Sequence, residues 1–351
     1  MYMAKLDKVF LKKLMDTVVP SGYEQEIVKL WIDNAKKITP NVYVDSVGSA
    51  HAIINPDAPY KIVVTGHCDE IGLVVKCITD KGFLRVGNIG GWDAQVIVGQ
   101  HVIIKTKHGK LHGVIGKKPI HRIDDPKSAS KIKDLYVDIG AKDKKDAEKM
   151  VEVGDVMVLD QGFTELANNC FACRACDNKV GTFVALEVLK ELANKKLPIC
   201  IEAIAATQEE IGSRGAIAAA YLSNANVCFV VDTAPTDDTP DETQNIDLKI
   251  RSGVAIGRGP HVNSKLFELL KNTAKANKIP YQIEASGNAF GTDTECFQLT
   301  RGGMISSLLS VPCRYLHSPS ETCSFDDIQS TIDLLVKTIS QINKKTDFSF
   351  I

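Results

Sequence analysis

The sequence predicts an α/β protein: a mixed β-sheet with helices on both faces, interrupted by a small β-barrel-like insert. Helical and strand-like segments alternate near both ends of the chain, whereas short β-branched runs follow one another between Gly72 and about Asp160. The length, 351 residues, exceeds what one ordinary core needs. We therefore expect an α/β domain built from residues 1–72 and 163–351, with a β-rich inserted domain at 73–162.

In the first part of the α/β domain, the apolar residues are at first spaced as in an amphipathic helix. Residues 6–37 read as two amphipathic helices that are separated at "VVPSGYE", where Pro20 to Gly22 predict a turn. The strand-like stretch "VYVDSVGSAHAIINP" follows, and after it the apolar strand "KIVVTGHCDEIG".

The insert is predicted by six short runs with turn residues between them. Glycine-containing turns such as "KHGKLHG" separate the runs, as in small barrels and sandwiches. The runs are "LVVKCIT", "FLRVGNIG", "QHVIIKTK", "KLHGVIG", "LYVDIGA" and "DVMVL".

The second part returns to alternating helices and strands. This alternation predicts a mostly parallel or mixed sheet that is covered by helices. Helices are expected at "NKVGTFVALEVLKELANKK", "RGAIAAAYLSNA", "VNSKLFELLKNTAKANK" and "FDDIQSTIDLLVKTISQINK"; strands at "LPICIEAIAAT", "ANVCFVVD", "YQIEAS" and "MISSLLSV".

Charge and composition exclude several classes of partner. Lysine plus arginine (42) nearly balance aspartate plus glutamate (43), which leaves no overall field to attract nucleic acid or an anionic membrane. No apolar run approaches the roughly 20 residues of a membrane span, and the N-terminal segment lacks the pattern of a signal peptide. Ten cysteines without an export signal are typical of reduced thiols, so we expect a cytoplasmic protein.

Acidic and imidazole side chains collect where the predicted strands end. A single polar residue at such a place is most often a helix cap or a turn residue. Five such places in one sheet make coincidence a poor explanation, because ligands collect beyond the carboxyl ends of the strands in open α/β sheets. The residues are His67, Asp69, Asp177, Glu209, Glu210, Asp232 and His317.

This set of side chains indicates a metal site. Histidine and carboxylate groups are ligands of zinc and its neighbours, and an acidic cluster without a cation would be electrostatically unstable. Two divalent ions roughly 3.5–4 Å apart, bridged by a carboxylate and a water, would balance the charges and generate a nucleophile at neutral pH.

Two rival signals fit less well. The cysteines of "CFACRAC" resemble the start of an iron–sulfur ligand run, but Val180 and Gly181 stand where a cysteine and a proline would complete it. A glycosidase needs two carboxyl groups about 5–9.5 Å apart across a sugar bond. The adjacent Glu209 and Glu210 fit that geometry poorly, and the chain has only two tryptophans for sugar stacking.

Six motifs, in this order along nearly the whole chain, resemble the M42 family of metalloaminopeptidases, some members of which carry the name endoglucanase. Within the insert, "GGWDAQVIVGQ" and "GVIGKKPIH" are similar to the same family. The resemblance implies a zinc-peptidase-like fold with an inserted dimerisation domain. The six motifs are "GHCDEIG" (Gly66–Gly72), "DNKVG" (Asp177–Gly181), "EEIGSRGA" (Glu209–Ala216), "VVDTAP" (Val230–Pro235), "GTDTECFQLTRGG" (Gly291–Gly303) and "RYLHSPSET" (Arg314–Thr322).

The resemblance also implies roles for the residues at the strand ends. Two divalent ions are expected per subunit, zinc first, with cobalt or manganese as alternatives. Glu209 would be the general base on a water that bridges the ions, and Asp69 would orient His67. The implied ligands are His67 and Asp232 on one ion, Glu210 and His317 on the other, and Asp177 as the bridge.

Two neighbouring glutamates make chemical sense in this scheme. One must bind metal through ionised oxygens, while the other takes and returns a proton, and a metal-bound carboxylate is a poor base. Adjacent side chains of a regular strand point to opposite faces, so the backbone must turn at the strand end.

We therefore expect an aminopeptidase that removes N-terminal residues from short peptides and assembles as a homo-oligomer, a dodecamer built from dimers. One alternative is a related dinuclear-metal deacylase or carboxypeptidase, for which Arg258 or Arg301 could bind a substrate carboxylate. A more remote alternative is a metal-stabilised assembly scaffold, which would have no use for Glu209.

Overall fold

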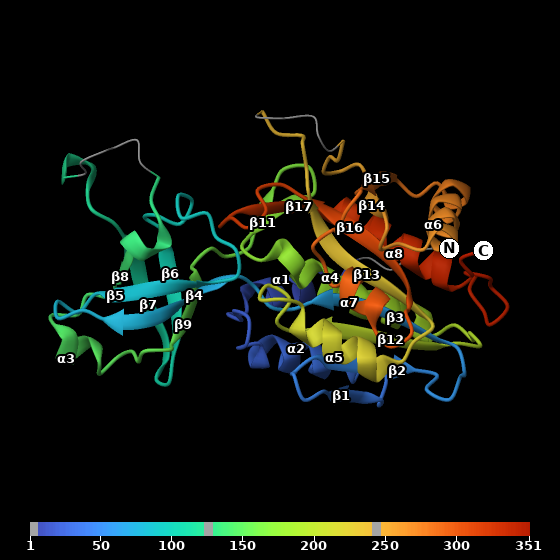
Figure 1. The fold of residues 1–351 in the computed structure, drawn as a ribbon, viewed down its shortest axis with the longest axis horizontal. Coiled ribbons are helices and arrows are strands. Elements are labelled where there is room, and N and C mark those ends of the chain that lie inside the picture. The colour runs from blue at the N-terminus through green and yellow to red at the C-terminus, as the bar shows by residue number, and fades with distance from the viewer. Residues whose placement is uncertain (1–5, 123–128, 241–246) are drawn as a thin grey trace.

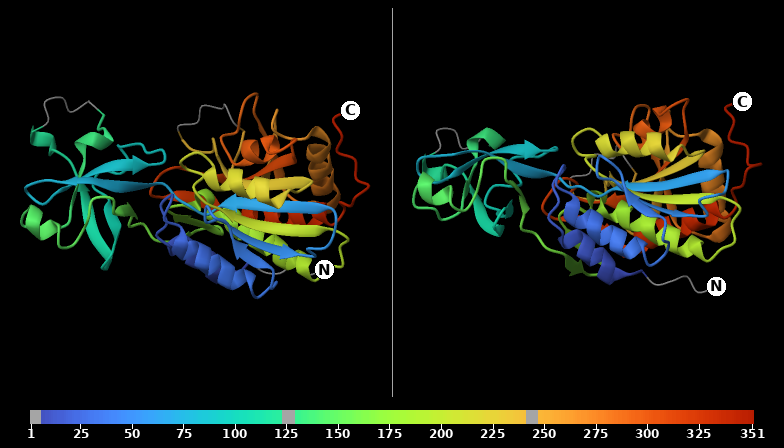
Figure 2. Two further views of the ribbon diagram at one scale, coloured as in Figure 1. Left: turned by 60° about the horizontal axis from the view of Figure 1, so that its bottom comes forward. Right: turned by 90° about the horizontal axis from the view of Figure 1, so that it is seen from below.

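The computed structural model describes residues 6–122, 129–240 and 247–351. A large mixed sheet with helices on both faces forms one part of the molecule, and a closed barrel projects from it at one end (Figure 1). Two further views keep the barrel at that end, so the molecule is elongated (Figure 2). Within the described ranges, none of the helices combines the length and apolar character of a membrane span. The predicted fold class is confirmed.

The large sheet has eight strands in the order β1-β2-β12-β3-β13-β16-β14-β15. The four central strands β12, β3, β13 and β16 run parallel, whereas β2 and β14 pair antiparallel with their central neighbours. The carboxyl ends of four parallel strands therefore meet at one edge of the sheet. The bounds are β1 Val42–Val44, β2 Ala50–Ile54, β3 Lys61–His67, β12 Cys200–Ala206, β13 Val227–Pro235, β14 Val254–Arg258, β15 Tyr281–Ala285 and β16 Ile305–Cys313.

Helices cover both faces of this sheet because its central strands are apolar on both sides. In β3, Ile62 and Val64 face the larger core, to which α1, α2, α4, α6 and α8 contribute, and Val63 faces a smaller core under α5 and α7. The bounds are α1 Lys8–Asp16, α2 Gln25–Ala35, α4 Cys176–Ala193, α5 Arg214–Ser223, α6 Ser264–Asn277, α7 Thr294–Leu299 and α8 Phe325–Ile339.

Several helices begin at side-chain caps. The carboxylate of Asp7 accepts the backbone N–H of Phe10 at 2.9 Å at the start of α1. Asn263 caps α6 in the same way, and Ser324 accepts the N–H of Asp326 at the start of α8. Each cap satisfies a donor that the first helical turn leaves free.

The barrel is formed by the six runs that the sequence singled out. They close in the order β4-β5-β8-β7-β6-β9 around a core of their own, separate from the cores of the large sheet. The bounds are β4 Gly72–Ile78, β5 Leu84–Ile89, β6 His101–Thr106, β7 Gly109–Gly116, β8 Tyr136–Asp138 and β9 Val156–Leu159, with the short helices η1 Ile120–Arg122, η2 Ile132–Asp134 and α3 Lys144–Ala147 between strands. The division into 1–72, 73–162 and 163–351 stays a prediction.

Three differences from the sequence reading concern the strands. A third sheet, β10-β11-β17, was not expected; its strands are β10 Thr164–Leu166, β11 Cys170–Cys173 and β17 Glu321–Ser324. The strand β14 was also missed. The stretch "VYVDSVGSAHAIINP" is two antiparallel strands, because Asp45 accepts three backbone N–H groups and Gly48 takes a φ of 106° in the turn between them.

Candidate active site

The side chains singled out at the strand ends gather at the carboxyl edge of the four parallel strands. The first of them, His67, is the last residue of β3, and the others come from the neighbouring strands and from α4. Asp232 lies in β13, Glu209 and Glu210 follow β12, His317 follows β16, Asp177 is the second residue of α4, and Asp69 follows β3.

Asp177 lies between the two histidines. Its Oδ1 is 3.3 Å from Nε2 of His67, and its Oδ2 is 3.4 Å from Nε2 of His317. Each of these Nε2 atoms also lies near a second carboxylate: that of His67 is 3.9 Å from Asp232, and that of His317 is 3.5 Å from Glu210. The carboxylate of Asp177 thus connects the group around His67 with the group around His317.

Both neighbouring glutamates reach the site because the chain turns before them. Gln208 adopts a left-handed φ of 57°, and its backbone N–H donates to Oε1 of Glu24 at 3.0 Å. Oε2 of Glu209 lies 3.8 Å from Nε2 of His67, while Glu210 faces His317. The backbone turn expected at this strand end is therefore present.

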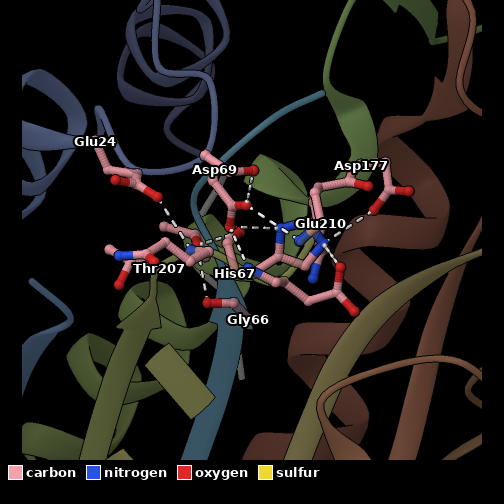
Figure 3. A network of polar contacts seen from close by, with 12 residues as sticks. Glu24, Gly66, His67, Asp69, Asp177, Thr207 and Glu210 are labelled. Atoms are coloured by element: carbon pink, nitrogen blue, oxygen red, sulfur yellow. Dashed lines mark hydrogen bonds and ion pairs between the residues drawn. The ribbon is translucent and has the colours of Figure 1, made fainter. Parts of the chain in front are cut away.

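Asp69 lies beside His67 and Glu210 (Figure 3), and it also contacts Glu209. Its two oxygens accept the backbone N–H groups of Glu209 and Glu210 at 3.0 and 3.2 Å, and the hydroxyl of Ser21 at 2.6 Å. Its Oδ1 also lies 3.3 Å from Nδ1 of His67. A fully buried carboxylate with these partners fixes both the imidazole and the turn.

Glu321 has a matching place on the other side, and the sequence analysis gave it no role. Its Oε1 accepts the backbone N–H of His317 at 2.8 Å, and its Oε2 accepts that of Asp177 at 2.9 Å. Only its position in "RYLHSPSET", four residues after His317, could have indicated this contact.

Close backbone contact between β3 and α4 sets the distance between His67 and Asp177. A Cβ on Gly66 would lie 2.4 Å from the carbonyl carbon of Gly181, so only glycine fits there. The hydroxyl of Thr182 donates to the carbonyl oxygens of Gly66 and His67 at 3.1 and 2.8 Å. These contacts hold the start of α4 against the end of β3.

The pKa values of these groups are shifted by burial, by repulsion between carboxylates and by attraction between carboxylates and histidines. Burial raises the pKa of Glu210 and of Asp232 well above the ordinary range, and the Asp177 carboxylate raises both further. Burial alone would also raise the pKa of Asp177, but its contacts with His317 and His67 hold it well below the usual value. Burial likewise opposes the charged form of His67, yet Asp177 and Asp69 raise its pKa.

The site has the character of a metal site. Among the described residues, none of the ion pairs of these carboxylates involves a lysine or an arginine. The buried Oδ1 of Asp177 and Oε1 of Glu210 accept no hydrogen bond from the described residues. Divalent cations would satisfy these oxygens and remove the repulsion.

Three overlapping groups of ligand atoms lie close enough to hold a metal ion, with the atoms of each group within 4.8 Å of one another. Two of them have the same composition as the two ligand sets implied by the family resemblance, and both include Asp177. The groups are His67, Asp177 and Asp232; Asp177, Glu210 and His317; and His67, Glu209 and Glu210. The roles of the individual residues stay a prediction.

The two arginines considered for a substrate carboxylate do not lie in this site. Arg258 ends β14, which is antiparallel to β16, so it lies toward the opposite edge of the sheet. The guanidinium of Arg301 donates twice to the carbonyl oxygen of Tyr221, at 2.9 and 2.6 Å, and lies 3.9 Å from the centre of its ring. Among the described residues, neither arginine forms an ion pair with a residue of the site, so the structure gives no support to a role for them in the carboxypeptidase alternative.

Comparisons with known proteins agree with the M42 resemblance. The family profile described as M42 glutamyl aminopeptidase matches residues 48–334. The lysyl aminopeptidase of Pyrococcus furiosus is 31% identical over 98% of this chain and 99% of its own length.

Solved structures give the same result for the fold. The TET aminopeptidase of a marine sediment Thaumarchaeota archaeon has a TM-score of 0.92 at 30% identity and covers 96% of each chain. The TET1 peptidase of Pyrococcus horikoshii, which can assemble into a tetrahedron or a large octahedral shell, has a TM-score of 0.85 at 29% identity and covers 95% of this chain and 99% of its own.

Proposed function

The chain belongs to the M42 family of aminopeptidases and is a peptidase, and from that premise we propose that it removes N-terminal residues from short peptides with two divalent ions bound at the acidic site. The observation that carries the proposal is the position of Asp177, one oxygen of which faces His67 and the other His317. A carboxylate shared in this way suits the bridge between two ions.

In this proposal His67 and Asp232 hold one ion, Glu210 and His317 hold the other, and Asp177 binds both. Zinc is the expected ion, with cobalt and manganese as alternatives, since all three accept nitrogen and carboxylate ligands. When bound, the ions supply a Lewis acid for the scissile carbonyl and lower the pKa of the attacking water.

Glu209 acts as the general base and later as the acid in this scheme. Its side chain is 14% exposed against 5% for Glu210, so it is the glutamate that solvent reaches more readily. Burial raises its pKa, which strengthens it as a base. It removes the proton of the attacking water and delivers that proton to the leaving amine.

The direct test compares amino-acid p-nitroanilides with their N-acetylated forms, using wild type and Glu209→Gln. We expect cleavage of the free-amine substrates only, loss of activity with chelator and recovery with zinc or cobalt. Glu209→Gln should keep its metal content and lose about 100- to 10,000-fold in turnover. Glu165→Gln changes an exposed glutamate of β10 that is not one of the site residues, and it is the matched control.

Two results would contradict the proposal. Equal cleavage of acetylated substrates would favour a deacylase, because an aminopeptidase needs the free amine. Full activity of Glu209→Gln would remove the base from the mechanism and leave the scaffold alternative open.

The assembly is part of the same proposal. The tetrahedral and octahedral shells of the P. horikoshii relative support a homo-oligomer. We expect the β-barrel to join subunits into dimers, and dimers to assemble into a dodecamer. Light scattering should give about 460 kDa, twelve times the 38.3 kDa of one chain. A monomer at micromolar concentration would contradict it.

A further inference from the structure

The turn at "VVPSGYE", between α1 and α2, contributes none of the proposed ligands or catalytic groups, but two of its side chains reach the surroundings of the acidic site. The hydroxyl of Ser21 donates to Asp69 at 2.6 Å. Glu24 directly precedes α2, is only 4% exposed and extends to the chain just after Thr207 (Figure 3). One short turn therefore contacts the edge of the site at two points.

Glu24 contacts the backbone at the strained residue next to Glu209. Its Oε1 accepts the N–H of Gln208 at 3.0 Å and the N–H of Gly22 at 2.8 Å. Gln208 has a left-handed φ of 57°, a conformation that a residue other than glycine keeps only when its surroundings hold it. The contact with Glu24 is one of the interactions that hold it.

The backbone around Glu209 is hydrogen-bonded through both its N–H and its carbonyl groups. The N–H groups of three consecutive residues, 208 to 210, donate to carboxylates: the first to Glu24, and the other two to Asp69. The carbonyl groups of residues 207 to 209 accept N–H groups from residues 212–215, where α5 begins, at 2.9 to 3.2 Å. Two buried carboxylates thus fix the path of the chain at Glu209.

We propose that Glu24 is a positioning residue for the general base: it fixes the backbone of Gln208 so that the carboxylate of Glu209 is held beside His67. This inference rests on the role proposed for Glu209. Oε2 of Glu209 lies 3.8 Å from Nε2 of His67, and its Oε1 lies 3.5 Å from Oγ of Ser213. Because both of these side-chain contacts are long, the direction of the carboxylate depends on the backbone that carries it.

The charge of Glu24 gives the fold no stability, which argues against a purely structural role. Burial and the charge of Asp69 raise the pKa of the Glu24 carboxyl to about 7, although backbone N–H groups, those of Gly22 and Gln208 among them, lower it. The ordinary pKa is 4.5, so the folded protein holds more protons than the unfolded chain between these values. Stability therefore falls as the pH rises through this range, and the ionised carboxylate is a cost to the fold above it.

The same turn also contacts the barrel. Nζ of Lys105, in β6, donates to the carbonyl oxygen of Tyr23 at 3.1 Å, and the hydroxyl of Tyr23 donates to that of Gly154 at 3.4 Å. A Cβ on Gly72 would lie 2.8 Å from Cβ of Pro20, so the first strand of the barrel passes close to the turn. These contacts give Glu24 a fixed support.

Substitutions of Glu24 test this role, because both N–H groups donate to the same oxygen. The amide oxygen of Glu24→Gln can accept both, whereas Glu24→Ala can accept neither. We expect Glu24→Ala to lose about 100-fold in kcat with KM and metal content unchanged, since a misplaced base slows the chemical step without weakening binding. Glu24→Gln should keep most of the turnover and, at pH 8, should unfold in no less urea than wild type. Glu26→Ala, at an exposed position of α2, is the control.

A double variant separates this proposal from the proposed function. If Glu24 acts through Glu209, adding Glu24→Ala to Glu209→Gln should cause no further loss of turnover. A further loss as large as that of the single variant, or a fall in the metal content of Glu24→Ala, would overturn the role of Glu24 and leave the base in place. Equal losses in Glu24→Gln and Glu24→Ala would overturn it as well. Full activity of Glu209→Gln would instead contradict the base itself, and this proposal with it.

Discussion

Two buried charged clusters share the contact between β3 and α4, and they differ in how their charges are balanced. In the first, Glu70 pairs with Lys179 at 2.8 Å and with Arg174 at 3.0 Å, and all three side chains are at least nine-tenths buried. In the second, the carboxylates around His67 and His317 meet no lysine or arginine among the described residues.

The difference distinguishes a structural cluster from a functional one. Cations of the chain itself balance Glu70, and Arg174 and Lys179 both also donate to the carbonyl oxygen of Thr17, at 2.7 and 2.9 Å. In the second cluster, the negative charge and the carboxylate oxygens are left for a cation that binds from solution. Removing one charge should therefore affect stability in the first cluster and metal binding in the second.

The largest effect is expected for Asp177→Asn. An amide supplies one oxygen where the carboxylate faces both histidines with two, so the shared contact is lost. We expect metal content to fall and turnover to drop by at least about a thousandfold. Metal analysis and steady-state kinetics test this, with the exposed Asp33→Asn as the control. Full metal content in Asp177→Asn would contradict the bridging role.

Lys179→Met should have the next largest effect, and on stability. The side chain keeps its length but leaves Glu70 buried with one cation instead of two, at a cost of about 3–5 kcal/mol in the free energy of unfolding. Urea unfolding of the metal-free protein measures it. Lys29→Met, at an exposed position of α2, should change this free energy by no more than about 0.5 kcal/mol.

Adding Glu70→Gln to Lys179→Met should recover part of the loss, because it removes the carboxylate left short of a partner. If Lys179→Met and Lys29→Met cost the same, the first cluster does not stabilise this region.

A smaller effect is expected for Asp69→Asn. The amide nitrogen cannot accept one of the N–H groups of Glu209 and Glu210, so the turn and the imidazole of His67 lose their common partner. We expect metal affinity or activity to fall about 10- to 100-fold. Ser21→Ala removes one of the same contacts and should cost less; metal titration of both variants compares them.

The smallest effect concerns pH. Burial opposes ionisation of Glu70, but Arg174 and Lys179 lower its pKa below the usual 4.5. Its stabilising contribution is therefore present above pH 4.5 and is lost as pH falls through the lowered value. In Glu70→Gln the decline of stability below pH 4.5 should be shallower, by up to about 1.4 kcal/mol per pH unit. Urea unfolding at several acid pH values measures it, and an unchanged slope would contradict the assignment.

The acidic site was predictable because its residues stand at strand ends. Apolar runs in the sequence indicated the strands β3, β12 and β13. Because these strands are parallel, their carboxyl ends lie at the same edge of the sheet, and residues there, such as His67 and Asp232, come together. The barrel was predictable for a similar reason, since each strand is a short run with a turn beside it. The strands β11 and β17 were missed because four-residue strands carry little periodic signal.

What the sequence by itself determined is therefore the order of elements and the chemistry available at their ends. Only the tertiary structure decided which distant groups meet. It gave Glu321 its contacts with Asp177 and His317, removed Arg258 from the site and brought the thiol of Cys176 to the carbonyl oxygen of Glu321, 145 residues further along the chain. The physical reason is that periodicity reports which face of an element is buried, whereas strand pairing and register decide its neighbours.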